Sequence, residues 1–316
     1  KLHFHLVDDN GWRLEIKKYP RLTEVGAWRV DHTDVPFHSR RNPLPGEPTP
    51  IGGFYTQEDM REMIAYAADR QVEIIPEIEM PAHTNSSLAA YPHLACPVVD
   101  RFIGVLPGLG GDHAGIIYCA GNDSVFTFLQ DVIDEVAALF PSHYIHLGGD
   151  EAQKTYWKKC PLCQDRMKKE HIAHEEDLQG YFMKRIGDYV RSKGKEVMES
   201  FIKAENNGKN ICMVYAHNDD MAIGAIQAIK EAGLKPGKDI LTGSIDGVPD
   251  IYKAMIDGEA NASVELTPNM AGPAFDALEK FKKDGTMPEK VTVTKSTLYL
   301  PDTAKEELEK KKNMGY

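Results

Sequence analysis

The stretch Tyr144-Ile-His-Leu-Gly-Gly-Asp-Glu151 decides the fold that we expect for the first two-thirds of this chain. Its short apolar run predicts a buried strand, and the two glycines allow a sharp turn after it. The turn places Asp150 and Glu151 at the carboxyl end of the strand. Parallel α/β barrels carry their chemistry at this end, because the loops that follow the strands converge there. A solvated acidic turn is the alternative, since most charged residues face water.

Length and composition indicate a globular protein with a neutral ligand. The 316 residues predict either one large barrel or two smaller units. Hydrophobic residues make up 42% of the chain and charged residues 27%, which is ordinary for a protein with a buried core. The formal net charge of −11 argues against a nucleic-acid partner, because a phosphate-binding surface needs clustered lysines and arginines.

The start of the chain shows no targeting signal. No apolar run reaches the ~18 residues that span a bilayer. The sequence begins at Lys1 inside an apolar alternation, without the charged and then apolar segments of a signal peptide. We therefore expect a fragment without a membrane span.

The cysteines are too few and too scattered for a disulfide framework. Cys160 and Cys163 form a Cys-x-x-Cys pair, as in zinc and redox sites, but no second pair lies at the usual spacing to complete four ligands. We therefore expect cysteines in surface loops, no metal and no cofactor. The five are Cys96, Cys119, Cys160, Cys163 and Cys212.

Two further strands are expected ahead of residue 144. Residues 2–7 alternate between apolar and polar and lead to Asp8, which would occupy a second strand end. Residues 72–78 form the other strand and lead to His83, although a proline at position 76 counts against a central strand.

Helices are expected between these strands. Thr56 and Asp59 have the spacing of a helix-start box. Asn122 or Ser124 precedes an apolar stripe of helical period that ends before Pro141. This alternation of strand and helix is typical of a parallel sheet.

The chain becomes ambiguous after residue 174. Residues 175–193 predict a helix closed by Gly194, after which residues 195–199 would form the next strand. From Met198 onward the same stretch fits the end of an amphipathic helix instead, and both interpretations stay open.

The remaining residues predict a smaller α/β arrangement. Residues 211–215 and 240–245 are expected strands, and one of residues 218–220 caps the helix between them. Asn218 and Asp246 then lie at adjacent strand ends, where open α/β sheets hold ligands. Amides and carboxylates suit sugar hydroxyls. The alternative is that both residues only cap helices.

Residues 1 to about 195 resemble part of a family 20 glycoside hydrolase, a β-N-acetylhexosaminidase. The blocks HFHLVDDNGWRLEIKKYPRLTEVGAW (3–28), PEIEMPAH (76–83) and HLGGDE (146–151) carry the resemblance and stand in the family's order. Residues from about 196 to 316 resemble the carboxyl-terminal part of a type I periplasmic sugar-binding protein of an ABC importer. Here the blocks are VYAHNDDMAIGAIQAIKEAGLKPGKDI, SIDG and VELTP.

Together the two resemblances imply an α/β protein of two partial domains. Residues 1–195 would form a partial (β/α)8 TIM-type barrel, and residues 196–316 a partial doubly wound lobe of a periplasmic binding protein. The family's first strand would precede Lys1 and its later strands would follow residue 199. The switch of family near residues 194–200 indicates a chimera, either one contiguous gene or two genes joined.

The hydrolase resemblance also implies roles for individual residues. Glycoside cleavage needs a protonated carboxylic acid beside the leaving oxygen and a group that stabilises the oxocarbenium ion. In this family the substrate's own 2-acetamido oxygen is the nucleophile. The resemblance therefore implies that Glu151 is the acid and that Asp150 orients the acetamido group. Asp8 and His83 match positions that shape the pocket or tune the acid, and His146 supports the strand.

The implied function is removal of terminal β-linked N-acetylhexosamine by substrate-assisted, retaining catalysis, with weak or no turnover because the barrel is incomplete. The alternative is a non-catalytic sugar-binding component of an ABC transporter, in which Asn218, Asp246 and, as a weaker match, Glu265 contact the sugar. Both resemblances imply a periplasmic or extracellular bacterial protein. Exposed edges of a half-barrel could also drive self-association.

Overall fold

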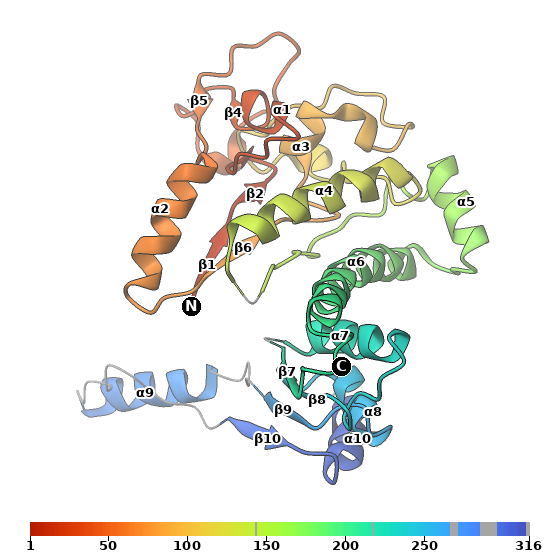
Figure 1. Cartoon of the computed structure of the whole chain (residues 1–316). Coiled ribbons are helices and arrows are strands. Elements are labelled where there is room, and N and C mark those ends of the chain that lie inside the picture. The colour runs from red at the N-terminus through yellow and green to blue at the C-terminus, as the bar shows by residue number, and fades with distance from the viewer. Residues whose placement is uncertain (143, 217, 266–270, 285–295, 314–316) are drawn as a thin grey trace. The chain divides into compact units, whose positions relative to one another are not determined.

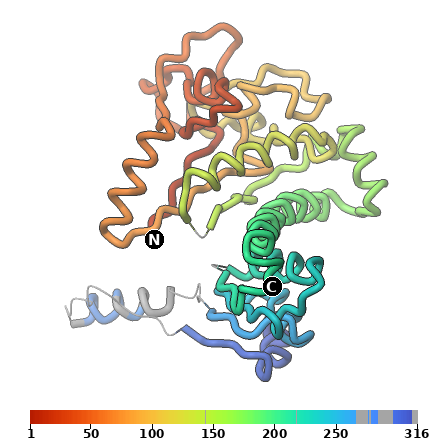
Figure 2. The backbone as a smooth tube through the Cα atoms, in the orientation of Figure 1, coloured from red at the N-terminus to blue at the C-terminus, as the bar shows by residue number. Residues whose placement is uncertain are grey.

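The computed structural model describes residues 1–142, 144–216, 218–265, 271–284 and 296–313. They divide into two compact units, residues 1–188 and 189–316. The chain passes from the first unit to the second once, through helix α6 (Glu175–Ala204), as Figures 1 and 2 show. Both the unit boundary and the expected family switch near residue 195 therefore fall inside one helix.

Helix α6 corrects our expectation of a helix end and a new strand. It continues through Gly194 to Ala204, so the expected strand over residues 195–199 is wrong and the alternative, the end of an amphipathic helix, is confirmed. A Cβ atom on Gly194 would lie 3.0 Å from the Cα atom of Met221. The glycine therefore permits close packing of helices in the second unit and does not act as a cap.

Parallel strands form the centre of the first unit. β1 (Leu2–His5) pairs in parallel with β6 (Ile74–Glu77). On the other side of β6, the Ile78 N–H donates to the His146 carbonyl and the His146 N–H donates to the Pro76 carbonyl, both at 2.9 Å. Pro76 fits this ladder because it contributes an acceptor there and needs no N–H.

The segment around residue 146 is less regular than expected. It joins the β6 ladder through one isolated parallel bridge, between Glu77 and His146, and does not form a longer strand. Tyr144 and Ile145 are half-buried, so the expectation of a buried strand is wrong. The backbone hydrogen bonds of His146 and Leu147 are made with β6 and the residues directly after it. The segment is therefore covered on the side that faces β6.

Two helices confirm the predicted caps. α2 (Gln57–Ala68) begins after Thr56, whose hydroxyl and backbone N–H exchange hydrogen bonds with Asp59 in a capping box. α4 (Asp123–Leu139) begins after Asn122, which accepts from the Ser124 N–H. The predicted stripe of α4 is buried, at Val125, Phe128, Leu129, Val132, Val136 and Leu139.

Short elements complete the first unit. Two antiparallel pairs are present, β2 (Val7–Asp8) with β3 (Gly11–Trp12) and β4 (Trp28–Arg29) with β5 (Ile51–Gly52). The expected strand over residues 2–7 is thus divided between β1 and β2. The remaining helices are α1 (Arg21–Glu24), η1 (Phe37–Ser39), α3 (Asn85–Ala90), η2 (Pro92–Leu94), η3 (Gly111–His113) and α5 (Pro161–Lys169).

The second unit is built on a sheet with the order β10-β9-β8-β7. The three strands β7 (Met213–Tyr215), β8 (Leu241–Ile245) and β9 (Ala262–Glu265) are parallel, and β10 (Thr297–Tyr299) is antiparallel to β9. The first two confirm the predicted strands. Helices α7 (Asp219–Glu231), α8 (Pro249–Ile256), α9 (Ala271–Asp284) and α10 (Ala304–Asn313) accompany them.

Both predicted ends of α7 are confirmed. Asn218 accepts a hydrogen bond from the Met221 N–H at the start, and Gly233 follows the end with a φ of +77°. The buried side of the unit includes Ile251, Tyr252 and Tyr299 in one cluster. Among the described residues, no helix is long and apolar enough to cross a membrane.

Candidate active site

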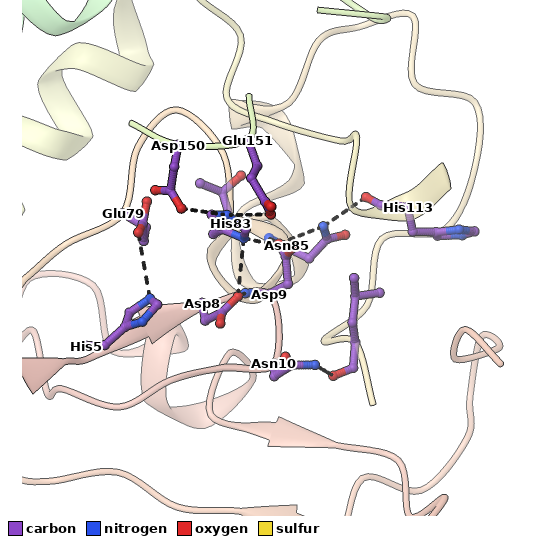
Figure 3. Close-up of polar contacts among 12 residues, drawn as sticks. His5, Asp8, Asp9, Asn10, Glu79, His83, Asn85, His113, Asp150 and Glu151 are labelled. Atoms are coloured by element: carbon purple, nitrogen blue, oxygen red, sulfur yellow. Dashed lines mark hydrogen bonds and ion pairs between the residues drawn. The ribbon is translucent and has the colours of Figure 1, made fainter. Parts of the chain in front are cut away.

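His83 lies at the centre of a cluster of carboxylates in the first unit (Figure 3). Its Nδ1 atom is 3.5 Å from Asp8 Oδ1 and 3.4 Å from Asp9 Oδ2. Its Nε2 atom is 3.6 Å from Asp150 Oδ2 and 3.6 Å from Glu151 Oε2. The structure therefore brings together Asp8, His83, Asp150 and Glu151, which the sequence analysis had selected from three separate blocks.

The parallel ladder explains why these blocks meet. Asp8 follows β1, His83 follows β6, and Asp150 follows the segment that joins β6 through His146. These three backbone segments run parallel, so their carboxyl ends lie at one edge.

The two glycines of the acidic turn have different reasons to be glycine. Gly148 has a φ of +65°, and a Cβ atom there would overlap the Glu79 carboxylate. Gly149 has a φ of +111°, which side chains other than glycine rarely adopt. Glu151 itself has a φ of +47°. This backbone turns the chain so that both acidic side chains face His83.

The catalytic candidates are open to solvent. The side chain of Asp150 is 65% exposed and that of Glu151 is 79% exposed. His83 is better covered, with 19% of its side chain exposed. The acidic pair therefore lies on the accessible side of the cluster, while the His83 ring separates it from Asp9, which is buried.

His83 carries a positive charge at neutral pH. Its contacts with Asp8 and Asp9 raise the pKa of the imidazole to about 11. Burial tends to raise the pKa of Asp8, but His83 and the Asp9 N–H hold that pKa below its ordinary value. The centre of the cluster is thus an imidazolium ion between carboxylates.

Asp9 and Asn85 form a support for His83 that the sequence analysis missed. Asp9 Oδ1 accepts hydrogen bonds from the Asn85 N–H and from Asn85 Nδ2, each at 3.0 Å. Asn85 Nδ2 also donates to the His113 carbonyl at 2.9 Å. Asp9 adjoins Asp8 in the sequence, but only the fold shows that it faces the same imidazole.

Glu79 is a second residue that the sequence analysis missed. It is 2% exposed, and its Oε2 atom has no hydrogen-bond partner among the described residues. Burial raises the pKa of Glu79 to about 8, with further contributions from Glu77 and from the charge of Asp150. The alternation of Glu77 and Glu79 in PEIEMPAH was the available signal, since residues two apart in a strand share a face.

His146 lies away from His83. Its Nδ1 atom is 2.7 Å from Glu77 Oε1, and its ring lies 4.9 Å from that of His3. His3 Nε2 is 2.8 Å from Glu77 Oε2. His146 therefore connects its own segment to β6 and β1 through Glu77.

The sugar-binding candidates of the second unit are engaged in local contacts. Asn218 caps α7, and the Asp246 N–H donates to the Val264 carbonyl at 2.9 Å. Glu265 accepts from Tyr299 Oη at 2.5 Å and from Lys311 Nζ at 2.8 Å. The block that contains Glu265 continues into residues 266–268, which lie outside the described residues.

Asp219, which the sequence analysis named only as a possible cap, is the buried acid of this unit. Its carboxylate accepts hydrogen bonds from the Gly247 and Val248 N–H groups at 2.7 and 2.8 Å. Ser244 Oγ and Ser263 Oγ also donate to it. These contacts connect the start of α7 to β8, β9 and the turn after β8.

The expectation of cysteines in surface loops is wrong for the first unit. Cys212 is exposed, whereas the others are buried, at Cys96, Cys119, Cys160 and Cys163. They come from separate segments that pack together, which sequence spacing could not reveal.

The chain matches one protein family over most of its length. The glycosyl hydrolase family 20 catalytic domain matches residues 1–235. The chain belongs to glycosyl hydrolase family 20. A β-hexosaminidase of Porphyromonas gingivalis (strain ATCC BAA-308 / W83) is 46% identical over 198 residues, which are 63% of this chain and 23% of that protein. A β-hexosaminidase of Vibrio furnissii is 39% identical over 205 residues, 62% of this chain and 31% of that protein.

The family 20 chain has a second similarity. The galactofuranose-binding protein YtfQ of Escherichia coli (strain K12) is 95% identical over 130 residues, 41% of this chain and 41% of that protein. The chain therefore joins hydrolase-like and binding-protein-like sequence, which confirms the predicted double resemblance. It spans less than half the length of each of these relatives.

Proposed function

We propose that the first unit carries the catalytic acid of a β-N-acetylhexosaminidase and is part of a (β/α)8 barrel. Glu151 is the acid and Asp150 the residue that orients the substrate's acetamido group. One observation carries this proposal: the Asp150 and Glu151 carboxylates meet at the same imidazolium nitrogen, at the carboxyl ends of parallel segments.

The proposed reaction uses the substrate as its own nucleophile. Glu151 donates a proton to the leaving oxygen while the acetamido oxygen bonds to the anomeric carbon and the glycosidic bond breaks. Asp150 accepts a hydrogen bond from the acetamido N–H and stabilises the positive charge of the cyclic intermediate. Water then attacks the anomeric carbon, and the bond between that carbon and the acetamido oxygen breaks. One proton of the water passes to Glu151, which restores the acid, and the anomeric configuration is retained.

His83 is proposed as a positioning residue for this pair. Two neighbouring carboxylates repel each other, and an imidazolium ion 3.6 Å from both offsets this repulsion. Asp8 and Asp9 keep the imidazole charged from the opposite side. His146 acts further away and holds its segment on β6 through Glu77.

Slow turnover is expected from the exposure of the acid. Charge stabilisation is strongest in a site that excludes water, and Glu151 is 79% exposed. The test is release of para-nitrophenol from a para-nitrophenyl N-acetyl-β-D-glucosaminide. Hydrolysis should be measurable and should be slower in Glu151→Gln. The matched control is Glu58→Gln on α2, whose side chain is 84% exposed. A folded chain without any turnover would contradict the proposal.

A second function is favoured by the 95% identity to a galactofuranose-binding protein. We propose that residues 196–316 form a partial sugar-binding lobe in which Asn218, Asp246 and Glu265 face the ligand. A furanose sugar should then raise the unfolding temperature of this unit by mass action. Glu151→Gln should leave that increase unchanged, and no increase at millimolar sugar would contradict this function.

Location and assembly follow from the same proposal. A chain related to a bacterial binding protein and to bacterial hexosaminidases suits a periplasmic or extracellular place.

Leu2 of β1 is 48% exposed, so an uncovered strand could pair with a second copy. Size-exclusion chromatography should then give a dimer or larger species, and a clean monomer would remove self-association.

A further inference from the structure

Buried cysteines converge in the first unit, outside the carboxylate cluster. Cys96 follows η2, Cys119 precedes α4, and Cys160 and Cys163 stand at the start of α5. Their sulfur atoms all lie within 4.8 Å of one another. The Sγ atoms of Cys96 and Cys163, of Cys119 and Cys160, and of Cys119 and Cys163 are each 3.7 Å apart.

This spacing matches a metal site and does not match disulfide bonds. Bonded sulfur atoms lie about 2.05 Å apart. Four thiolates around a tetrahedral zinc ion, with Zn–S bonds of about 2.3 Å, have neighbouring sulfur atoms roughly 3.8 Å apart. We propose that Cys96, Cys119, Cys160 and Cys163 bind one structural zinc ion.

The cluster supplies what a structural zinc site needs. All the ligands are soft sulfur donors, which select zinc over harder divalent cations such as magnesium or calcium. Four protein ligands fill a tetrahedral shell and leave no position for a catalytic water. The burial of every sulfur also excludes solvent from the ion. The site is therefore structural, and the Cys-x-x-Cys pair finds its missing partners 41 and 67 residues away in the sequence.

The start of α5 offsets the negative charge of the thiolates. Cys160 is the residue before the first turn, and Pro161 occupies the first position of the helix. Backbone N–H groups and the positive end of the helix dipole stabilise anions at this position. Two of the four ligands thus have a local reason to remain ionised.

The surrounding backbone is packed for a fixed site. A Cβ atom on Gly121 would overlap the Leu162 carbonyl, so the turn after Cys119 lies directly against the start of α5. Trp157 Nε1 donates to the Tyr118 carbonyl at 2.8 Å and is fully buried. The ion would hold these segments together at a point where no disulfide connects them in the described structure.

The site also bears on the acidic turn. Residues 152–159 connect Glu151 to Cys160. A zinc ion at Cys160 therefore fixes the far end of the segment that carries Asp150 and Glu151. Zinc binding itself does not depend on the proposed hydrolase function, and it is tested without an activity measurement.

The test is metal analysis of the full chain, purified under reducing conditions without chelator and equilibrated with zinc sulfate. We expect about one zinc per chain after gel filtration, and a cobalt-substituted sample should show the visible bands of tetrahedral cobalt thiolate. The double variant Cys119→Ser/Cys163→Ser should lose both signals. Cys212→Ser, the exposed control, should keep them.

Thiol counting on the wild-type chain separates the alternatives even if the double variant fails to fold. With zinc bound, a thiol reagent should react readily with Cys212 alone, and the other thiols should become reactive when a chelator removes the ion. Failure to bind zinc would overturn the proposal, as would an intact mass with two disulfides after purification without reductant, or a preference for iron over zinc.

Discussion

Asp150 and Glu151 of the first unit and Asp219 of the second unit both follow strand-like segments and end in opposite environments. Each of these segments runs parallel to its neighbour. Asp150 and Glu151 are 65% and 79% exposed and face an imidazolium ion. Asp219 is buried and receives hydrogen bonds from two backbone N–H groups and two serine hydroxyls.

The difference separates a carboxylate available for chemistry from one used for structure. Donors that surround Asp219 leave little capacity for a substrate, and their bonds hold two strands and a helix together. The side chains of Asp150 and Glu151 remain accessible to a ligand, but they are only weakly anchored. A strand followed by an acidic residue therefore predicts where the carboxylate lies. The number of hydrogen-bond donors around the carboxylate predicts whether its role is chemical or structural.

The largest expected effect concerns Glu151. With an N-acetylglucosamine disaccharide, whose leaving group needs a proton, Glu151→Gln should lower kcat/KM by about 10²- to 10⁴-fold. With a para-nitrophenyl leaving group, which needs less help, the loss should be smaller. The unfolding temperature should not change, because Glu151 is exposed. Equal losses of kcat/KM on both substrates, or a fall in unfolding temperature, would contradict this prediction. Glu151 would then not differ from Asp219 as a carboxylate used for chemistry.

Asp219→Ala should have the reverse profile. Removal of the carboxylate leaves buried donors without an acceptor, which should lower the free energy of unfolding of the second unit by roughly 3 kcal/mol. Hydrolysis should continue at the wild-type rate. Chemical denaturation followed by circular dichroism measures the loss, and Asp257→Ala at an exposed position is the control. A loss no larger than that of the control would show that Asp219 is not a structural acid.

His83→Gln tests the centre of the cluster through pH. The ordinary pKa of 6.5 is raised to about 11 in the folded chain, so the charged imidazole stabilises the fold fully below pH 6.5. This contribution decreases as the pH rises from 6.5 towards 11. The variant should therefore lose more unfolding free energy at pH 6 than at pH 10, on the order of 2 kcal/mol at the lower pH. A pH-independent loss would indicate a packing role only.

Glu79→Gln should give the smallest effect on stability. Unlike the other variants, it should stabilise the fold at high pH. The pKa of Glu79 is raised from 4.5 to about 8, so the folded chain favours the protonated form and loses stability as the pH rises through this range. Glutamine cannot ionise. Its unfolding temperature relative to wild type should therefore be higher at pH 9 than at pH 5, as scanning calorimetry can measure. No difference between the two pH values would contradict the buried position of the acid.

Sequence patterns predicted local elements well and long-range neighbours poorly. The capping box at Thr56 and the cap at Asn218 depend on residues three apart, and both are confirmed. Gly194 was misinterpreted because a glycine that permits helix packing resembles one that ends a helix. Tyr144 lies in a half-buried segment because burial depends on its spatial neighbours, which the motif does not contain.

The same limit applies to the sites. Motif blocks named Asp8, His83, Asp150 and Glu151, and the fold brings these four together. The support from Asn85 arises from packing, so no spacing rule could predict it. The spacing of Glu77 and Glu79 indicates that the two share a face, but the burial of Glu79 depends on its spatial neighbours. Cys96 and Cys119 are too far from Cys160 in the sequence to suggest one cluster, and only coordinates show their sulfur atoms within reach of one ion.

The most direct measurement compares two substrates that differ only at the sugar's second carbon, the para-nitrophenyl β-glycosides of N-acetylglucosamine and of glucose. If Asp150 orients an acetamido group that attacks the anomeric carbon, the chain hydrolyses the first, Glu151→Gln hydrolyses it more slowly, and the glucoside remains intact. Equal hydrolysis of both glycosides, or hydrolysis of the glucoside alone, would contradict the assignment of the acidic pair.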